Sequence, residues 1–90
     1  MKMHLPARAP NEGARLLARW VMGLSGGIAE AAQVMGTGAD RVQRMVEGNM
    51  VPGLDVGTRL SRRIGVKARD FHAAPAGGWF DAAEPLAQAA

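Results

Sequence analysis

Basic side chains gather in the second half of the chain, and phosphate binding is the chemistry that their type and spacing support best. Seven Lys and Arg residues stand against two acidic residues between Arg41 and Arg69. Arg59, Arg62 and Arg63 recur at intervals of three and four residues, which place them on one face of a helix. Such a face can contact nucleic-acid phosphates or an acidic partner, although a lone cluster of this kind also forms an ordinary solvated surface.

Residues suited to catalysis or to metal binding are sparse. The chain has no Cys, and His4 and His72 have no acidic residue at ligand spacing, so we expect no metal site. Ser25 and Ser61 lack a base in any known nucleophile arrangement, and the acidic residues form no pair with an obvious pocket. The segment 36–38 lacks the preceding strand and the following Lys-Ser/Thr of a phosphate-cradling loop. We therefore expect neither enzymatic activity nor a cofactor.

Length and composition limit the protein to one small module. Ninety residues hold a single domain, near the size below which one hydrophobic core becomes marginal. The net charge of +3 and the pI of about 10.6 favour a nucleic acid as partner. The longest apolar-leaning stretch, Ala14 to Leu24, contains Arg15 and Arg19 and is too short to cross a bilayer, so we expect no membrane partner. The absence of Cys fits a reducing compartment, and we expect the cytoplasm.

Apolar residues at helical spacing predict an all-α fold. We expect helices over residues 12 to 22 or 23, 28–35, 39–47 and 54–64, followed by a short helical turn anchored by Val66 and Phe71. Asn11 is suited to cap the first helix, and Ser25 is suited to cap the second. The expected core positions on these helices are Leu16, Leu17, Trp20, Val21, Met22, Leu24, Ile28, Ala31, Ala32, Met35, Val42, Met45, Val46, Leu54, Leu60 and Ile64.

The distribution of large apolar residues predicts one folded unit with two arms. Twenty of the 26 apolar residues larger than Ala lie between Asn11 and His72. We therefore expect a folded domain over 11–72, an extended N-terminal arm over 1–10 and a C-terminal tail over 73–90. The tail contains the adjacent aromatic residues Trp79 and Phe80, which we expect to dock within the chain or across a dimer.

The break between the second and third expected helices is only three residues long, which is typical of a helix-turn-helix. The run IAEAAQVMGTGADRVQRMVEGNMVPGLDVGTRLSRRIGVKARDF resembles the lambda-repressor-like, Cro-type helix-turn-helix DNA-binding family over about half of the chain. The resemblance implies a compact four- to five-helix domain whose third helix enters the DNA major groove. The positions that carry it are Ala32, Gly36, Val42, Met45, Gly48, Pro52, Leu54, Leu60, Ile64, Gly65 and Val66.

Carried onto this chain, the resemblance implies base-reading positions in the helix over residues 39–47. Arg44 can donate a bidentate fork to guanine, and Gln43 can pair with adenine. Asp40 departs from a basic reading surface, because phosphates repel a carboxylate, although it could accept from cytosine or pair with Arg44. The expected DNA-contacting residues are Thr37, Gly38, Ala39, Asp40, Arg41, Gln43, Arg44, Asn49, Arg59, Arg62 and Arg63.

The leading hypothesis is a sequence-specific regulator of transcription, a repressor that binds palindromic double-stranded DNA as a homodimer, because one short helix contacts too few bases. A related hypothesis is the antitoxin of a toxin-antitoxin module, which would also bind a toxin protein. It is based on a resemblance of the opening Met-Lys-Met-His and the Pro-containing arm to the plasmid-maintenance antidote branch. The alternative from another class is a protein-interaction module without DNA readout. Ala39 and Asp40 at reading positions favour it, as do Gly27 and Ile28, where the family often has a capping Ser and a phosphate-contacting Gln.

Overall fold

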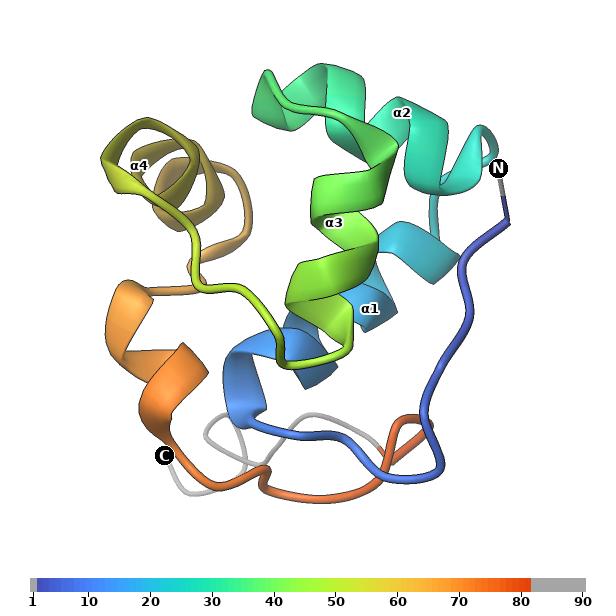
Figure 1. Ribbon diagram of the computed structural model, residues 1–90, viewed down its shortest axis with the longest axis vertical. Helices are drawn as coiled ribbons and strands as arrows, with labels where there is room; N and C mark the ends of the chain where they lie inside the picture. Colours follow the sequence, from blue (N-terminus) through green and yellow to red (C-terminus); the bar gives the residue numbers. More distant parts are fainter. Residues whose placement is uncertain (1, 82–90) are drawn as a thin grey trace, which may run out of the picture.

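The computed structural model describes residues 2–81, and helices account for all the regular structure in that part of the chain (Figure 1). The elements are α1 (Glu12–Met22), α2 (Gly27–Met35), α3 (Ala39–Val46), α4 (Leu54–Ile64) and the 3-10 helix η1 (Ala68–His72). The radius of gyration is 12.1 Å, close to the value of about 12 Å for a folded chain of this length. The expected all-α class is confirmed, and the expected helices agree with the observed ones to within a residue or two.

The core lies where α1, α2 and α3 meet. In Figure 1, α3 runs through the middle of the molecule, α1 passes behind it and α2 crosses near its N-terminal end. The α4 helix stands at the side, next to α2, and η1 packs on α1. The buried hydrophobic residues of the helices and of the segment between α4 and η1 are Ala14, Leu17, Ala18, Val21, Ile28, Ala31, Ala32, Met35, Val42, Met45, Val46, Leu60, Val66 and Phe71. The half-buried residues at the edge of this core include Leu16, Trp20, Leu24 and Ile64.

The ends of the first two helices have local causes. The side-chain oxygen of Asn11 accepts from the backbone N–H of Ala14 at 2.7 Å, which confirms the expected cap of α1. The expected cap of α2 by Ser25 is wrong. Gly26 is the N-cap, and its N–H donates at 2.8 Å to the carboxylate of Glu30, a longer side chain that reaches back from the helix. The helix ends at Gly36, whose φ of +72° lies in the left-handed region that favours glycine.

Two expected core residues lie on the surface. Leu54 is 86% exposed and Met22 is 41% exposed. The buried face of α4 is set by Leu60, with Val56 one turn before it, and Leu54 precedes Val56 by two residues, or about 200° around the helix. Met22 lies only about 40° around the helix from the buried Ala18, but it is the last residue of α1, where the helix extends beyond the face that the core covers.

Both ends of the described chain pack against the helices. The indole N–H of Trp79 donates to the Pro6 carbonyl at 2.8 Å, and the Trp79 side chain is buried. Trp79 therefore docks within the chain, one of the two arrangements expected, whereas Phe80 is 76% exposed. The part of the expected tail beyond residue 81 lies outside the described residues.

An ion pair inside α1 fastens the C-terminal segment. Arg15 is 1% exposed, and it donates from Nε and Nη2 to the two carboxylate oxygens of Glu12, both at 2.8 Å. Its Nη1 donates to the Asp81 carbonyl at 3.1 Å, and the Ala76 N–H donates to Glu12 at 2.7 Å. Hydrogen bonding from Arg15 holds the pKa of Glu12 below its ordinary value, against the opposing effect of burial. Arg15 therefore belongs to the interior, although it looked like a charge that interrupts an apolar stretch.

Candidate nucleic-acid interface

The α2 and α3 helices are joined by three residues, Gly36, Thr37 and Gly38. The N–H of Thr37 donates to the Ala32 carbonyl at 2.9 Å, which closes the end of α2 and turns the chain toward α3. Gly38 is the N-cap of α3 in an extended conformation and offers no side chain as a cap. A Cβ at Gly38 would lie 2.7 Å from the Asp40 carboxylate, so glycine lets the turn pass close to the first residues of α3. This geometry presents the start of α3 at the surface.

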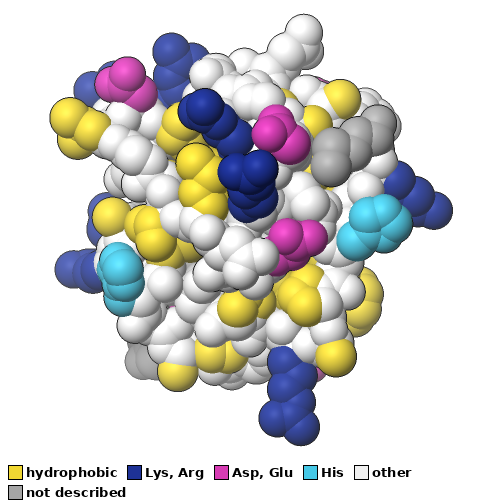
Figure 2. Space-filling model, viewed as in Figure 1, with side chains coloured by type: hydrophobic (Ala, Val, Ile, Leu, Met, Phe, Trp, Pro, Cys, Tyr) yellow, Lys and Arg dark blue, Asp and Glu magenta, His cyan; other side chains and the backbone are white. Residues whose placement is uncertain are grey.

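The outer face of α3 carries charged side chains. Asp40, Arg41 and Arg44 are exposed, while Val42 and Met45 on the opposite face are fully buried and hold the helix in the core. Basic side chains stand over α3 in the middle of the view in Figure 2, with acidic side chains beside them. Within residues 2–81 the one ion pair joins Arg15 to Glu12, so Asp40 and Arg44 are not paired with each other. Two guanidinium groups on this face are thus available to a ligand.

The other expected positions around α3 differ in exposure. Thr37 is half-buried and lines, with Arg41, a hollow of about 510 Å³ between the turn and the start of α4. Ala39 is half-buried and packs against the core. Asn49 is exposed, and its side chain donates to Glu47 at 3.4 Å. Thr37, Gly38, Asp40 and Arg41 therefore lie together at the N-terminal end of α3, while Arg44 is exposed in its last turn.

Gln43 is placed differently from its charged neighbours, because its side chain is only 6% exposed. Its Oε1 accepts from the His4 N–H at 3.0 Å, and its Nε2 donates to the His4 carbonyl at 2.7 Å. Nε2 also donates to the Glu47 carboxylate at 2.9 Å. The amide that the sequence assigned to base reading is occupied by the N-terminal arm in this conformation. No pattern in the sequence indicated that contact.

The three arginines of α4 form a second basic area. Arg59, Arg62 and Arg63 are exposed and, together with Val34 of α2, line a hollow of about 460 Å³. The Arg59 guanidinium covers the turn, since a Cβ on Gly36 would lie 2.8 Å from its Nη1. No acidic side chain lines this hollow. The expected sharing of one helical face by these arginines is confirmed, and Arg59 lies over the α2–α3 turn.

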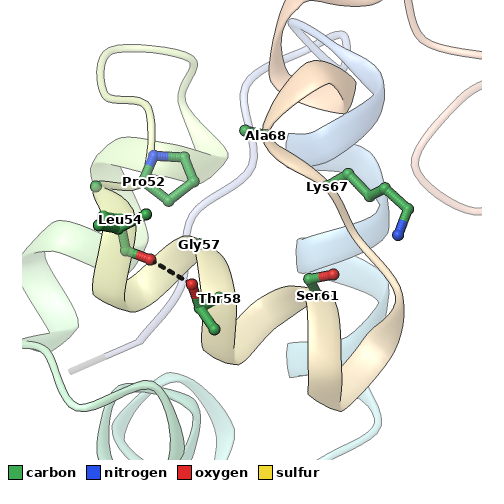
Figure 3. A pocket seen from close by; sticks show the side chains of 8 residues that line it. Pro52, Leu54, Gly57, Thr58, Ser61, Lys67 and Ala68 are labelled. Carbon is green, nitrogen blue, oxygen red and sulfur yellow. Dashed lines mark hydrogen bonds between the residues drawn. The ribbon is translucent and has the colours of Figure 1, made fainter.

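A third hollow, of about 440 Å³, lies on the other flank of α4 and is shown in Figure 3. The Thr58 hydroxyl in it donates to the Leu54 carbonyl at 2.8 Å, so this polar group is used within the helix. The remaining lining consists of Pro52, Gly53, Gly57, Ser61, Lys67 and Ala68. This hollow offers a ligand one charged side chain, in contrast to the three arginines on the opposite flank.

The start of α2 lacks the phosphate-binding groups that a capping Ser and a Gln would supply. Ile28 is 2% exposed and belongs to the core, and Gly27 has no side chain. The carboxylate of Glu30 already occupies the N–H of Gly26. Gly26, Gly27 and Ile28 therefore offer a phosphate no side-chain donor.

Neither another kind of site nor similarity to a known protein assigns a function to this chain. In residues 2–81, no group of three His, Asp or Glu side chains lies close enough together to hold a metal ion. No helix in that part of the chain has the length and apolar character to cross a bilayer. Comparisons with protein-family models, with curated proteins and with solved structures found no match. The arrangement of α2, α3 and α4 is therefore the basis for assigning a function.

Proposed function

We propose that this protein is a sequence-specific DNA-binding regulator of transcription, a repressor of the lambda-repressor-like helix-turn-helix class. The observation that carries the proposal is the three-residue turn between α2 and α3, together with the exposed, unpaired Arg41 and Arg44 on the outer face of α3. In a helix-turn-helix the second helix enters the major groove and its first residues contact base edges. On this basis Arg44 donates to guanine, and Asp40 accepts from cytosine.

The distribution of charge supports contact with phosphates beside the groove. Arg59, Arg62 and Arg63 surround a hollow without acidic lining next to the α2–α3 turn. Phosphate contacts position a protein on DNA and give binding its salt dependence, while base contacts give specificity. The α4 arginines therefore supply affinity, and α3 supplies sequence preference.

We propose a two-fold symmetric homodimer as the DNA-bound form. The α3 helix spans eight residues, and its exposed polar groups are too few to select one site in a genome. Two copies on half-sites one helical turn apart, about 34 to 36 Å between centres, double the number of base contacts. The operator is accordingly a palindrome.

The experiment is selection of bound duplexes from a random library by the purified full chain at near-physiological salt, followed by titration of the enriched site and a scrambled duplex. The expected result is a palindrome bound at least about 10³-fold more tightly than scramble. Weak, salt-sensitive binding with no enriched motif would contradict the proposal.

Substitution of Arg44 tests the docking of α3 on the selected site. Arg44→Ala is expected to lose about 1 to 3 kcal/mol of discrimination at one base pair of each half-site, because a bidentate contact is removed. Arg44→Lys keeps the charge without the fork, and it is expected to retain affinity for scramble while losing most of the same preference. If Arg44→Ala selected the same site with unchanged preference, α3 would not be docked as proposed.

A second candidate function is a protein-interaction module that retains the helical fold without base readout. The exposed apolar side chains of Leu54 and Phe80 favour it, as does the occupied amide of Gln43. An antitoxin would combine DNA binding with such a protein surface. Protein interaction as the sole function predicts that Arg44→Ala leaves function intact, whereas Phe80→Ala or Leu54→Ser abolishes partner binding.

A further inference from the structure

The His4 peptide occupies the Gln43 amide with the pattern of donor and acceptor that a base edge offers. The His4 N–H donates to Oε1 at 3.0 Å and the His4 carbonyl accepts from Nε2 at 2.7 Å, so one residue of the arm makes both bonds. Glutamine reads adenine in the same bidentate way, because adenine presents the N6 amino group as donor and N7 as acceptor in the major groove. The His4 peptide and an adenine edge would therefore use the same donor and the same acceptor of the Gln43 side chain, and cannot both bind it at once.

We propose that the N-terminal arm competes with DNA for Gln43, so that Gln43 reads adenine only after residues 2–6 have left α3. The inference rests on the proposed function, since it concerns regulation of the same reading helix. Burial supports it, because Gln43 is 6% exposed while Asp40, Arg41 and Arg44 on the adjoining face are exposed. In the arm-docked state sequence preference comes from the exposed residues alone.

The contacts that hold the N-terminal arm determine how easily it leaves Gln43. Met3 and Leu5 are partly buried against the core on either side of His4. Two residues beyond His4, the Pro6 carbonyl accepts from the indole N–H of Trp79 at 2.8 Å. The C-terminal segment that carries Trp79 thus fastens the arm that covers Gln43. Loosening either end of the chain shifts the population toward the state in which the Gln43 amide is free for DNA.

The decisive variant is His4→Pro, which removes the N–H that donates to the Gln43 Oε1. The side chain of residue 4 is exposed, so the proline ring replaces no buried group. His4→Ala is the matched control, because it keeps both backbone groups and changes only the side chain. Binding of the full-length variants to the selected duplex and to duplexes substituted one base pair at a time is measured by titration. The apparent affinity for DNA is proportional to the fraction of protein molecules in the binding-competent state. Releasing the arm increases that fraction, so it is expected to raise the apparent affinity.

The expected result is a new preference for adenine at one position of each half-site in His4→Pro, of about 5- to 150-fold, with tighter binding to the best site. His4→Ala is expected to match the wild type. In the double variant His4→Pro with Gln43→Ala, the adenine preference is expected to disappear while the preference due to Arg44 remains. This dependence on Gln43 separates release of the amide from a general change in the arm.

Docking of the arm is measured without DNA by hydrogen exchange of the His4 amide. Trp79→Phe keeps an aromatic ring and removes the donor to Pro6, so the His4 amide is expected to exchange about 2- to 10-fold faster, with no change in the amides of α3. Unchanged exchange at His4 would show that the C-terminal segment does not fasten the arm, and that part of the proposal would be wrong.

Two outcomes separate failure of the inference from failure of the proposed function. If the wild type selects a palindrome but His4→Pro shows the affinity and base preference of His4→Ala, or binds more weakly, competition by the arm is wrong and DNA readout stands. If neither the wild type nor His4→Pro prefers any duplex, the proposed function is wrong and the competition falls with it, even where hydrogen exchange shows a docked arm.

Discussion

The α1 and α3 helices differ in the environment of an arginine side chain, because Arg15 is buried and paired on α1 and Arg44 is exposed on the outer face of α3. Along α1, Arg15 is 1% exposed, and its guanidinium donates to the Glu12 carboxylate and the Asp81 carbonyl. On the outer face of α3, Arg44 is exposed and makes no ion pair with any of residues 2–81. The first arrangement leaves nothing for a ligand to bind, and the second leaves a fork of donors facing solvent.

The paired charge on α1 stabilises the fold, whereas the exposed charge on α3 is available for binding. A buried charge is tolerated only with a partner, because an uncompensated buried ion costs several kcal/mol. An exposed guanidinium contributes little to folding, so its position on α3 has no structural requirement behind it. Substitutions in the two regions should therefore separate cleanly into those that unfold the protein and those that change its binding.

The largest effect is expected from Glu12→Ala. Arg15 would stay buried without its carboxylate and Ala76 would lose its acceptor, which lowers the free energy of unfolding by about 3 kcal/mol. Urea denaturation measures the change. Asp55→Ala is the control, because Asp55 is also an acid in the first turn of a helix but is exposed, and it should cost well under 1 kcal/mol. Equal costs for the two variants would contradict the assignment of Arg15 to a buried pair.

The same ion pair predicts sensitivity to acid. The pKa of Glu12 is lower in the folded protein than its ordinary value of 4.5, so the unfolded chain takes up the proton first as the pH falls. The stabilisation is fully present above pH 4.5 and is lost as the pH falls through the lowered pKa. Glu12→Gln does not titrate there, so its deficit in unfolding free energy relative to wild type should shrink between about pH 5 and pH 2. A constant deficit over this range would contradict the shift.

Arg62→Ala should act on binding and not on stability. It is expected to weaken binding to selected and scrambled duplexes alike, and to reduce the slope of log affinity against log salt by about 0.9, the value for one phosphate contact. Unfolding should change by less than about 0.5 kcal/mol. Arg69→Ala on η1, which packs on α1, removes an equal charge outside the lining of that hollow and should leave the slope nearly unchanged. Equal changes in slope would mean that the hollow lined by Arg59, Arg62 and Arg63 does not contact phosphate.

The smallest effect is expected from Leu54→Ser. Its side chain is 86% exposed, so the change in the free energy of unfolding should stay within about 0.5 kcal/mol. Leu60→Ala on the buried face of the same helix should cost about 2 to 5 kcal/mol. A large cost at Leu54 in a concentrated sample that disappears on dilution would reveal that a second copy covers it.

The features that were predicted correctly from the sequence are those that depend on residues close together along the chain. The apolar spacing, the Asn11 cap and the turn at Gly36 each involve residues a few positions apart, and the structure confirms them. Failures within helices came from the first and last residues, where Leu54 and Met22 extend an apolar pattern beyond the face that another helix covers.

The candidate site was predictable in part for the same reason. Exposure of Arg44 follows from helical periodicity, because Val42 and Met45 fix the buried face. The burial of Gln43 does not follow, since it depends on a backbone contact with His4 that spans 39 positions. Arg15 depends in the same way on Asp81, which is 66 positions away. Periodicity carries no information about such pairs.

The bond between Pro6 and Trp79 joins positions 73 apart, and so connects the segment before α1 with the segment after η1. The chain between these two residues is thus closed into a loop, and the entropic cost of closing it rises only slowly with its length. A contact between residues this distant in the sequence should form late in folding, after the local contacts of the helices.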